Sequence, residues 1–279
     1  MQVVRTRHAL RTTLDEYAPT VRIGFVPTMG ALHRGHLQLV AQSRSANDVT
    51  VVSVFVNPSQ FNNADDLARY PRDEARDVAM LADAGVDVMF APGAEEVYPA
   101  DHATWVTVTG VTDVLEGVFR PGHFRGVATV VTLLLRMIRP HRAYFGEKDW
   151  QQLLVVTQLA RDLMLNVEIV GVPTVREADG LAMSSRNARL GESARAKARG
   201  INAAIRATQD RYVQGERDAL VLESLLHAAL AREVELTVEY ATVVNAATLR
   251  AITHVHEPAR VLVAAAIDGV RLIDNGPLG

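Results

Sequence analysis

The first 170 residues alternate short, largely β-branched runs with longer stretches whose apolar positions recur at helical spacing. The short runs predict strands at residues 21–26, 49–56, 86–90, 143–145 and 167–170. The longer stretches predict helices at residues 35–45, 73–84, 124–138 and 150–163. Strands that alternate with helices indicate βαβ units, which form a parallel sheet with right-handed crossovers.

The pattern changes after residue 171. Residues 192–232 predict two helices around a loop at 213–215. Two β-rich segments follow, at residues 236–244 and 260–274. The second contains Asp268-Gly269, a dipeptide typical of a tight hairpin. Helices followed by antiparallel strands predict a small α+β domain.

We therefore predict an α/β fold with two domains. Residues 1–171 would form a Rossmann-like parallel sheet flanked by helices, and residues 172–279 a smaller C-terminal α+β lid domain. Residues 172–189 lie at the change in pattern and are expected to form a hinge that carries a phosphate clamp. In open parallel sheets, ligands bind beyond the carboxyl ends of the strands.

Composition and charge exclude several classes of protein. The formal net charge of −3 gives no basic field for nucleic acid. The chain has no cysteine, which excludes disulfides, thiolate metal sites and cysteine nucleophiles and fits a cytoplasmic protein. Charged residues interrupt residues 1–20, so we expect no signal peptide. The apolar run near residues 127–138 is too short to span a bilayer.

The most informative stretch is P-T-M-G-A-L-H-R-G-H at residues 27–36, directly after the first predicted strand. A glycine-containing turn followed by a helix start would point backbone N–H groups and the imidazoles of His33 and His36 at one spot. Such a spot suits a nucleotide phosphate. The alternative is a helix cap with a packed histidine. A metal site is a weaker interpretation, because no third ligand stands nearby in sequence, and no protein-held metal is expected.

Two further polar segments follow predicted strands. In Gly146-Glu147-Lys148-Asp149, the lysine can meet phosphate as a point charge and Asp149 can cap a helix, although a solvated turn is the alternative. Gln60, after the second predicted strand, and Gln152 carry amides suited to a small substrate with hydroxyl and carboxylate groups. Either can equally be a surface glutamine.

A third polar segment, Met183-Ser184-Ser185-Arg186-Asn187, lies in the predicted hinge. Two hydroxyls and a guanidinium in one loop suit a phosphate clamp. A capping segment for the next helix is the alternative interpretation.

Taken together, these motifs resemble the pantothenate synthetase (pantoate–β-alanine ligase) family. The similarity covers most of the first 190 residues and the strand at 272–275. It is carried by the 27–36 stretch, F-V-N-P-S-Q-F at 55–61, Y-P-R at 70–72, R-P-G-H-F at 120–124, G-E-K-D at 146–149 and P-T-V-R-E-A-D-G-L-A-M-S-S-R-N at 173–187. The H-x-G-H pair alone indicates only the wider nucleotidyl-transferase superfamily.

The resemblance implies a two-step reaction. The carboxylate of (R)-pantoate attacks the α-phosphate of ATP with Mg²⁺, giving pantoyl adenylate and pyrophosphate. The amine of β-alanine then attacks the acyl carbon and releases AMP. The family also implies a homodimer. The net charge and the short apolar run predict no nucleic acid and no membrane as partner.

The same resemblance assigns residues. Gln60 would contact pantoate and β-alanine, and Gln152 would contact pantoate. His36 is the family's usual candidate for a proton donor, but phosphoryl transfer depends more on positioning and charge stabilisation, so we favour an N–H donor. The expected catalytic residues are His33, His36, Lys148, Ser184, Ser185 and Arg186. The expected ATP-binding residues are Met29, Gly30, Ala31, Leu32, His33, Arg34, Gly35, His36, Gly146, Glu147, Lys148, Asp149, Val175, Met183, Ser184, Ser185 and Arg186.

Three alternative functions remain at this point. Another nucleotidyl transferase would share the H-x-G-H loop, but a phosphate acceptor would require a second basic cluster, whereas this chain offers Gln60 and Gln152. A fragment of a class I aminoacyl-tRNA synthetase disagrees with the net charge of −3. A non-enzymatic nucleotide-binding module would be revealed by a turnover assay.

Overall fold

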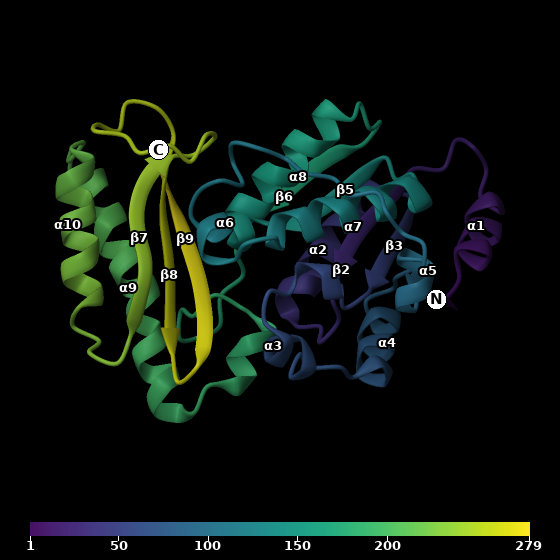
Figure 1. Ribbon diagram of the computed structural model, residues 1–279, viewed down its shortest axis with the longest axis horizontal. Helices are drawn as coiled ribbons and strands as arrows, with labels where there is room; N and C mark the ends of the chain where they lie inside the picture. Colours follow the sequence, from purple (N-terminus) through teal and green to yellow (C-terminus); the bar gives the residue numbers. More distant parts are fainter. The chain divides into compact units, whose positions relative to one another are not determined.

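The computed structural model describes residues 1–279. Its internal contacts divide the chain into two compact units, which Figure 1 shows in sequence colours. One unit contains residues 1–147 and 152–173, and the other contains residues 148–151 and 174–279. The first is built on a parallel sheet and the second on a small antiparallel sheet with helices, which confirms the predicted fold class.

The N-terminal unit contains a six-stranded sheet in the order β1-β4-β3-β2-β5-β6, and every pair is parallel. The five predicted strands are present, and β1, the short edge strand, was missed. The strands are β1 (Gln2–Val4), β2 (Ile23–Thr28), β3 (Val49–Val54), β4 (Val88–Phe90), β5 (Arg142–Gly146) and β6 (Glu168–Val172).

Strand β2 runs two residues beyond the predicted end at Val26 and includes Pro27. The carbonyl of Ile23 points toward β5, because it accepts a hydrogen bond from the N–H of His141. The backbone polar groups of alternate residues in a strand point to the same side, so those of Pro27 also point toward β5. Pairing with β5 covers only Gly24 and Phe25. The missing N–H of Pro27 therefore interrupts no ladder, which is the condition under which a strand tolerates proline.

Helices cover this sheet. Helix α2 packs against β2, β3 and β5, and α7 packs against β2 and α1. None of the helices combines the length and the hydropathy that crossing a membrane requires. The helices are α1 (Arg7–Asp15), α2 (Arg34–Ala46), α3 (Ala64–Ala68), α4 (Glu74–Asp83), α5 (Ala94–Val97), α6 (Glu116–Phe119), α7 (His123–Ile138) and α8 (Trp150–Asp162), with 3₁₀ turns η1 (Pro58–Gln60) and η2 (Glu147–Asp149).

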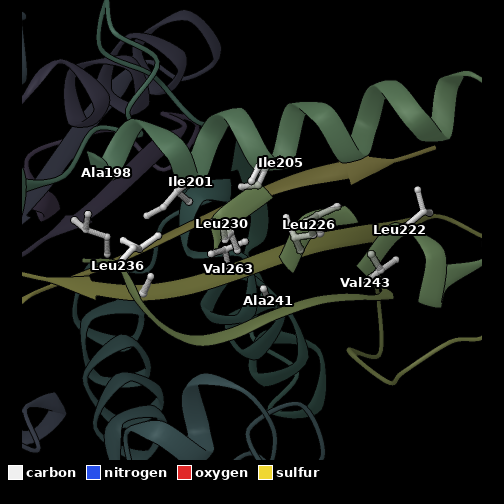
Figure 2. Packing of buried hydrophobic residues seen from close by; sticks show 14 of the residues in the cluster. Ala198, Ile201, Ile205, Leu222, Leu226, Leu230, Leu236, Ala241, Val243 and Val263 are labelled. Carbon is white, nitrogen blue, oxygen red and sulfur yellow. The ribbon is translucent and has the colours of Figure 1, made fainter. Parts of the chain in front are cut away.

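The C-terminal unit packs two helices on an antiparallel sheet in the order β7-β8-β9. Figure 2 shows Ile201 and Ile205 of α9 and Leu226 of α10 meeting the strand residues Ala241 and Val263. Burying each such leucine or isoleucine contributes about 1.5–3 kcal/mol. The elements are η3 (Ser185–Arg189), α9 (Glu192–Val213), α10 (Ala219–Leu230), β7 (Thr237–Asn245), β8 (Ala259–Ile267) and β9 (Val270–Leu278).

The turn between β8 and β9 is the predicted tight hairpin. Ile267 pairs with Val270, which leaves Asp268 and Gly269 as the two turn residues. Their φ angles are 48° and 69°. Two consecutive positive φ angles match the twist of a hairpin, and Asp-Gly adopts them readily.

Candidate active site

The candidate site begins where the strand order of the parallel sheet reverses. The chain places β3 and β4 on one side of β2, and β5 and β6 on the other. The carboxyl ends of β2 and β5 therefore flank the switch point at which such sheets bind ligands. The 27–36 stretch follows β2, and Gly146 ends β5. The sequence correctly placed both segments at this edge.

The turn after β2 is held by side chains of the same unit. Gly30 and Ala31 have positive φ angles of 81° and 49°. The N–H of Gly30 donates to Thr28 Oγ1 at 3.2 Å. The N–H groups of Ala31 and Leu32 donate to the carboxylate of Asp77, at 2.9 and 2.8 Å. The three N–H groups therefore donate to side chains of the protein, whereas the sequence predicted that backbone N–H groups of this turn point at a phosphate.

Asp77 lies on α4 and is 1% exposed. Burial raises the pKa of its carboxyl, and the hydrogen bonds from the N–H groups of Leu32 and Ala31 act in the opposite direction. Charge-assisted hydrogen bonds from backbone N–H groups are what allow a buried carboxylate to remain in a core. Sequence reasoning missed Asp77 because it stands far along the chain from the turn.

The two histidines form a reciprocal cap at the start of α2. His33 is the N-cap residue, and its Nδ1 accepts from the N–H of Gly35 at 3.2 Å. His36 Nδ1 accepts from the N–H of His33 at 3.3 Å. The rings stack with centroids 4.0 Å apart, and both side chains are half-buried.

This cap fixes where each imidazole carries its proton. A nitrogen that accepts a hydrogen bond from an amide has no proton of its own, so both Nδ1 atoms are acceptors. The proton of each ring is then at Nε2, which leaves His33 and His36 with one N–H donor each. The capping alternative and the donor role are therefore compatible, since they use opposite nitrogens of the same ring.

A polar cluster after β3 orients Gln60. The Gln60 side chain is 8% exposed, and its Oε1 accepts from Asn57 Nδ2 at 2.9 Å. Its Nε2 lies 3.1 Å from Met29 Sδ. Asn57 Oδ1 in turn accepts from the hydroxyl of Tyr98 at 2.9 Å. Burial raises the pKa of the Tyr98 phenol, whereas its hydrogen bonds with Ser59 and Asn57 act to lower that pKa. The amide of Gln60 is thus an oriented group, and the surface-glutamine alternative does not hold.

Helix α7 supports the backbone of the same residue. His123 Nδ1 lies 2.9 Å from the carbonyl oxygen of Gln60, so this ring carries its proton at Nδ1, and its Nε2 accepts from Arg120 at 3.2 Å. Gly126 makes the close approach possible, because a Cβ there would lie 2.3 Å from the carbonyl oxygen of Ser59. Asn57, Tyr98 and His123 were not among the predicted site residues, although Asn57 and His123 lie within the quoted motifs.

The segment Lys148–Gln151 belongs to the C-terminal unit by its contacts. The carbonyl of Lys148 accepts from Asn275 Nδ2 at 2.8 Å, and Asn275 Oδ1 accepts from Arg260 Nε at 2.6 Å. The guanidinium of Arg260 lies 3.5 Å from the centroid of the Trp150 ring, and Trp150 Nε1 donates to the carbonyl of Ala246 at 2.8 Å. Trp150 is therefore a packing residue. Gln152, half-buried on α8, follows this segment.

The predicted phosphate clamp forms a short hairpin followed by η3. The N–H of Met183 donates to the carbonyl of Val175 at 2.9 Å, and Ser184 caps η3 by accepting from the N–H of Arg186 at 3.2 Å. Ser184 does not cap the long helix α9, whose N-cap is Gly191. The alternative interpretation, in which this segment caps the next helix, is therefore wrong for α9 and correct for the 3₁₀ turn η3.

The base of this hairpin is fixed by a partly buried ion pair. Arg176 contacts both carboxylate oxygens of Asp274, at 2.6 and 3.0 Å, and Asp274 is 4% exposed. Bidentate pairs of this kind fix geometry as well as charge.

An open, all-parallel sheet whose switch point carries a strand–turn–helix segment with a reciprocal histidine cap defines a doubly wound α/β protein with a ligand-binding edge at that point. Residues 2–277 match the family model described as pantoate–β-alanine ligase. The chain is 50% identical over 277 residues to a pantothenate synthetase of Cereibacter sphaeroides, covering 99% of each chain. It is also 50% identical to one of Chloroflexus aggregans, again covering 99% of each. The chain belongs to the pantoate–β-alanine ligase family.

Solved structures agree with this assignment. The pantothenate synthetase of Thermus thermophilus matches with a TM-score of 0.95 at 48% identity, over 99% of both chains. A pantoate–β-alanine ligase of Francisella tularensis, solved as a complex with β-γ ATP and β-alanine, matches with a TM-score of 0.82 at 34% identity, over 99% of this chain and 97% of that one. The chain is therefore a ligase that condenses pantoate with β-alanine, as the sequence predicted.

Proposed function

We propose that the condensation runs through pantoyl adenylate. A pantoate carboxylate oxygen bonds to the α-phosphorus of ATP while the bond to the pyrophosphate oxygen breaks. The amine nitrogen of β-alanine then bonds to the acyl carbon, AMP leaves with the former carboxylate oxygen, and the nitrogen loses a proton. The observation that carries this proposal is the pair of Nε2–H donors at the switch point, within the same unit as the oriented amide of Gln60.

We propose that His33 and His36 stabilise charge on the phosphates and do not transfer a proton. Their Nδ1 atoms are occupied by backbone N–H groups, so each ring offers a neutral donor at Nε2. Pyrophosphate leaves as an anion that needs no proton from the protein, and phosphoryl transfer relies on positioning and electrostatics. This role makes His36 a catalytic residue without making it an acid.

The remaining predicted residues keep their proposed roles in binding ATP. Side chains supply most of the contacts on this account, because the N–H groups of residues 30–32 are used inside the turn. Lys148 and Arg186 carry the positive charge, and Ser184 and Ser185 carry hydroxyl donors. The complete proposed set is Met29, Gly30, Ala31, Leu32, His33, Arg34, Gly35, His36, Gly146, Glu147, Lys148, Asp149, Val175, Met183, Ser184, Ser185 and Arg186.

We propose that Gln60 binds pantoate and β-alanine and that Gln152 binds pantoate. Asn57 donates to Gln60 Oε1, and Gln60 Nε2 uses one hydrogen toward Met29 Sδ, so its second hydrogen is proposed to donate to a substrate hydroxyl or carboxylate. The Francisella tularensis relative was solved with β-γ ATP and β-alanine, which supports a site that takes both. Mg²⁺ is proposed to enter with ATP and to be held mainly by its phosphates.

We propose that residues 172–189 move when ATP binds, because a reactive adenylate must be kept from water. Cleavage of this segment by a protease should slow at saturating ATP, and an unchanged rate would remove the support for a hinge. A homodimer in the cytoplasm, where ATP is available, completes the proposal. Sedimentation at micromolar concentration tests the dimer.

The decisive experiment separates the two half-reactions. Enzyme, ATP, Mg²⁺ and pantoate without β-alanine should release pyrophosphate equal to the enzyme sites, and added β-alanine should release AMP and pantothenate. Exchange of labelled pyrophosphate into ATP should require pantoate but not β-alanine. If both exchange and pyrophosphate release require β-alanine, the adenylate proposal is wrong. If no pantothenate forms under any condition, the family assignment does not extend to activity.

A further inference from the structure

Asp77 connects α4 to the turn that precedes the two histidines. Its two carboxylate oxygens accept from the N–H groups of Ala31 and Leu32, at 2.9 and 2.8 Å. The partners are 46 and 45 residues away in sequence, so this is a tertiary contact. The carboxylate is 1% exposed and sits against the turn so closely that a Cβ on Gly30 would lie 2.9 Å from its Oδ2.

The turn needs such a support. Ala31 has a φ of 49°, a left-handed conformation that an alanine rarely adopts without help from its surroundings. Its N–H and that of Leu32 would lose their hydrogen bonds to the carboxylate if Asp77 were replaced, at a turn where both residues are buried. Thr28 Oγ1, which accepts from the N–H of Gly30 at 3.2 Å, holds only the first residue of the turn.

The position of the turn sets the position of the imidazoles. His33 directly follows Leu32 and is the N-cap of α2, and the N–H of His33 holds the ring of His36. A shift of the turn would therefore move both rings together. We propose that Asp77 is a positioning residue for adenylation, which holds residues 30–32 and through them the Nε2–H donors of His33 and His36. This inference rests on the function proposed above and adds a residue that never touches ATP.

The test compares Asp77→Asn with a control on the same helix. An asparagine has nearly the same shape, but it offers one acceptor and turns an NH₂ toward the other N–H. Asp73→Ala is the control, because Asp73 is exposed and caps α4 by accepting from the N–H of Arg76 at 3.1 Å without contacting the turn. This variant removes one cap of α4 and none of the hydrogen bonds that Asp77 makes to the turn.

The first readout is pantoate-dependent exchange of pyrophosphate into ATP, measured well below the melting temperature of each variant. We expect Asp77→Asn to lower kcat by about ten- to a hundredfold, because a misplacement of about 1 Å can cost on the order of a hundredfold. KM for pantoate should change less than about twofold, and Asp73→Ala should leave kcat within about the same twofold margin.

The second readout is the tautomer of the histidines, followed by nitrogen-15 NMR of histidine-labelled protein. In the wild type, His33 and His36 should show an unprotonated Nδ1 and a protonated Nε2, whereas His123 should show the reverse. Asp77→Asn should shift the signals of His33 and His36 and leave those of His123 unchanged. A general loss of structure would instead move all three.

Three outcomes would overturn the proposal. One is a kcat for Asp77→Asn equal to that of Asp73→Ala. Another is a lower kcat with unchanged signals from His33 and His36, and the third is a shift of all three histidines. If Asp77→Asn does not fold, Asp77→Glu retains both oxygens on a longer side chain and should show the same selective loss. If the wild type shows no pantoate-dependent exchange, the proposed function fails, while the NMR comparison still tests the support of the histidines.

Discussion

Replacing His36 separates its role in catalysis from its role in capping helix α2. His36→Ala removes the Nε2–H donor and also the Nδ1 acceptor of the His33 N–H. His36→Gln removes the imidazole donor but can restore the cap, because glutamine at this position of a helix start accepts from the N-cap N–H. The two variants therefore differ in stability while sharing the loss of the imidazole.

The expected magnitudes follow from these two contacts. One lost donor to a transition-state oxyanion costs about 10²–10³ in rate, or roughly 2.7–4 kcal/mol. One lost cap costs about 0.5–2 kcal/mol of stability. Domains typically have a free energy of unfolding of about 5–15 kcal/mol. His36→Ala should therefore remain folded, and its lower rate should not come from unfolding. His36→Gln should recover most of the stability and little of the rate.

The assay is a single-turnover measurement of pyrophosphate release with ATP and pantoate, without β-alanine. Gln38→Ala, at an exposed position on the same helix, is the control and should change the rate less than about twofold. A loss of threefold or less for His36→Ala would identify His36 as a cap only, given a cost of about 10²–10³ for a lost donor. A neutral donor also predicts a rate that stays level as the pH rises from neutral to mildly alkaline. A steep fall over that range would show that a protonated imidazole is required and would refute the neutral-donor role.

Three more outcomes are expected. In Gln60→Glu, the fold increase in KM for pantoate should exceed the fold increase in KM for ATP by about tenfold or more. The reason is that a carboxylate replaces the oriented Nε2 donor and repels the substrate carboxylate. Equal changes in the two KM values would contradict the assignment of Gln60 to pantoate. Asn275→Asp removes the donor to the carbonyl of Lys148 and should raise KM for ATP by about tenfold, which is the equivalent of one net hydrogen bond. Unchanged steady-state kinetics would show that this contact does not position Lys148. Leu226→Ala should lower the free energy of unfolding by about 2–5 kcal/mol, measured by denaturant titration, with kcat unchanged below the transition; a loss under 1 kcal/mol would mean that the core in Figure 2 refills the space.

Hydrophobic periodicity predicted the long elements because each covers one face of a sheet. The predicted strands β2 to β6 and helices α2, α4, α7 and α8 are present, with boundary shifts of a few residues. Strand β1 and helix α1 were missed for a physical reason. The strand has three residues, and only Leu10, Thr13 and Leu14 of α1 are buried, so neither element shows a full apolar stripe.

The chemistry of the site was less visible than its location. Glycine and histidine spacing predicted the turn after β2 and the start of α2, because those choices are local. The partner of the turn was not local: Asp77 lies between Arg76 and Val78 on α4, a context typical of a solvated helix position. The orientation of Gln60 likewise depends on Asn57 and Tyr98, which tertiary folding brings together.

The attachment of Lys148–Gln151 to the C-terminal unit means that no single cut in the sequence separates the two units. A fragment that ends at residue 173 would retain Lys148 and Trp150 but lose Asn275 and Ala246, which hold them by hydrogen bonds. The same attachment restricts the exchange of residues 174–279 between relatives. The transplanted unit would have to bind residues 148–151 of the recipient chain. Recombination within this family should therefore succeed only when residues 148–151 are inherited together with residues 174–279.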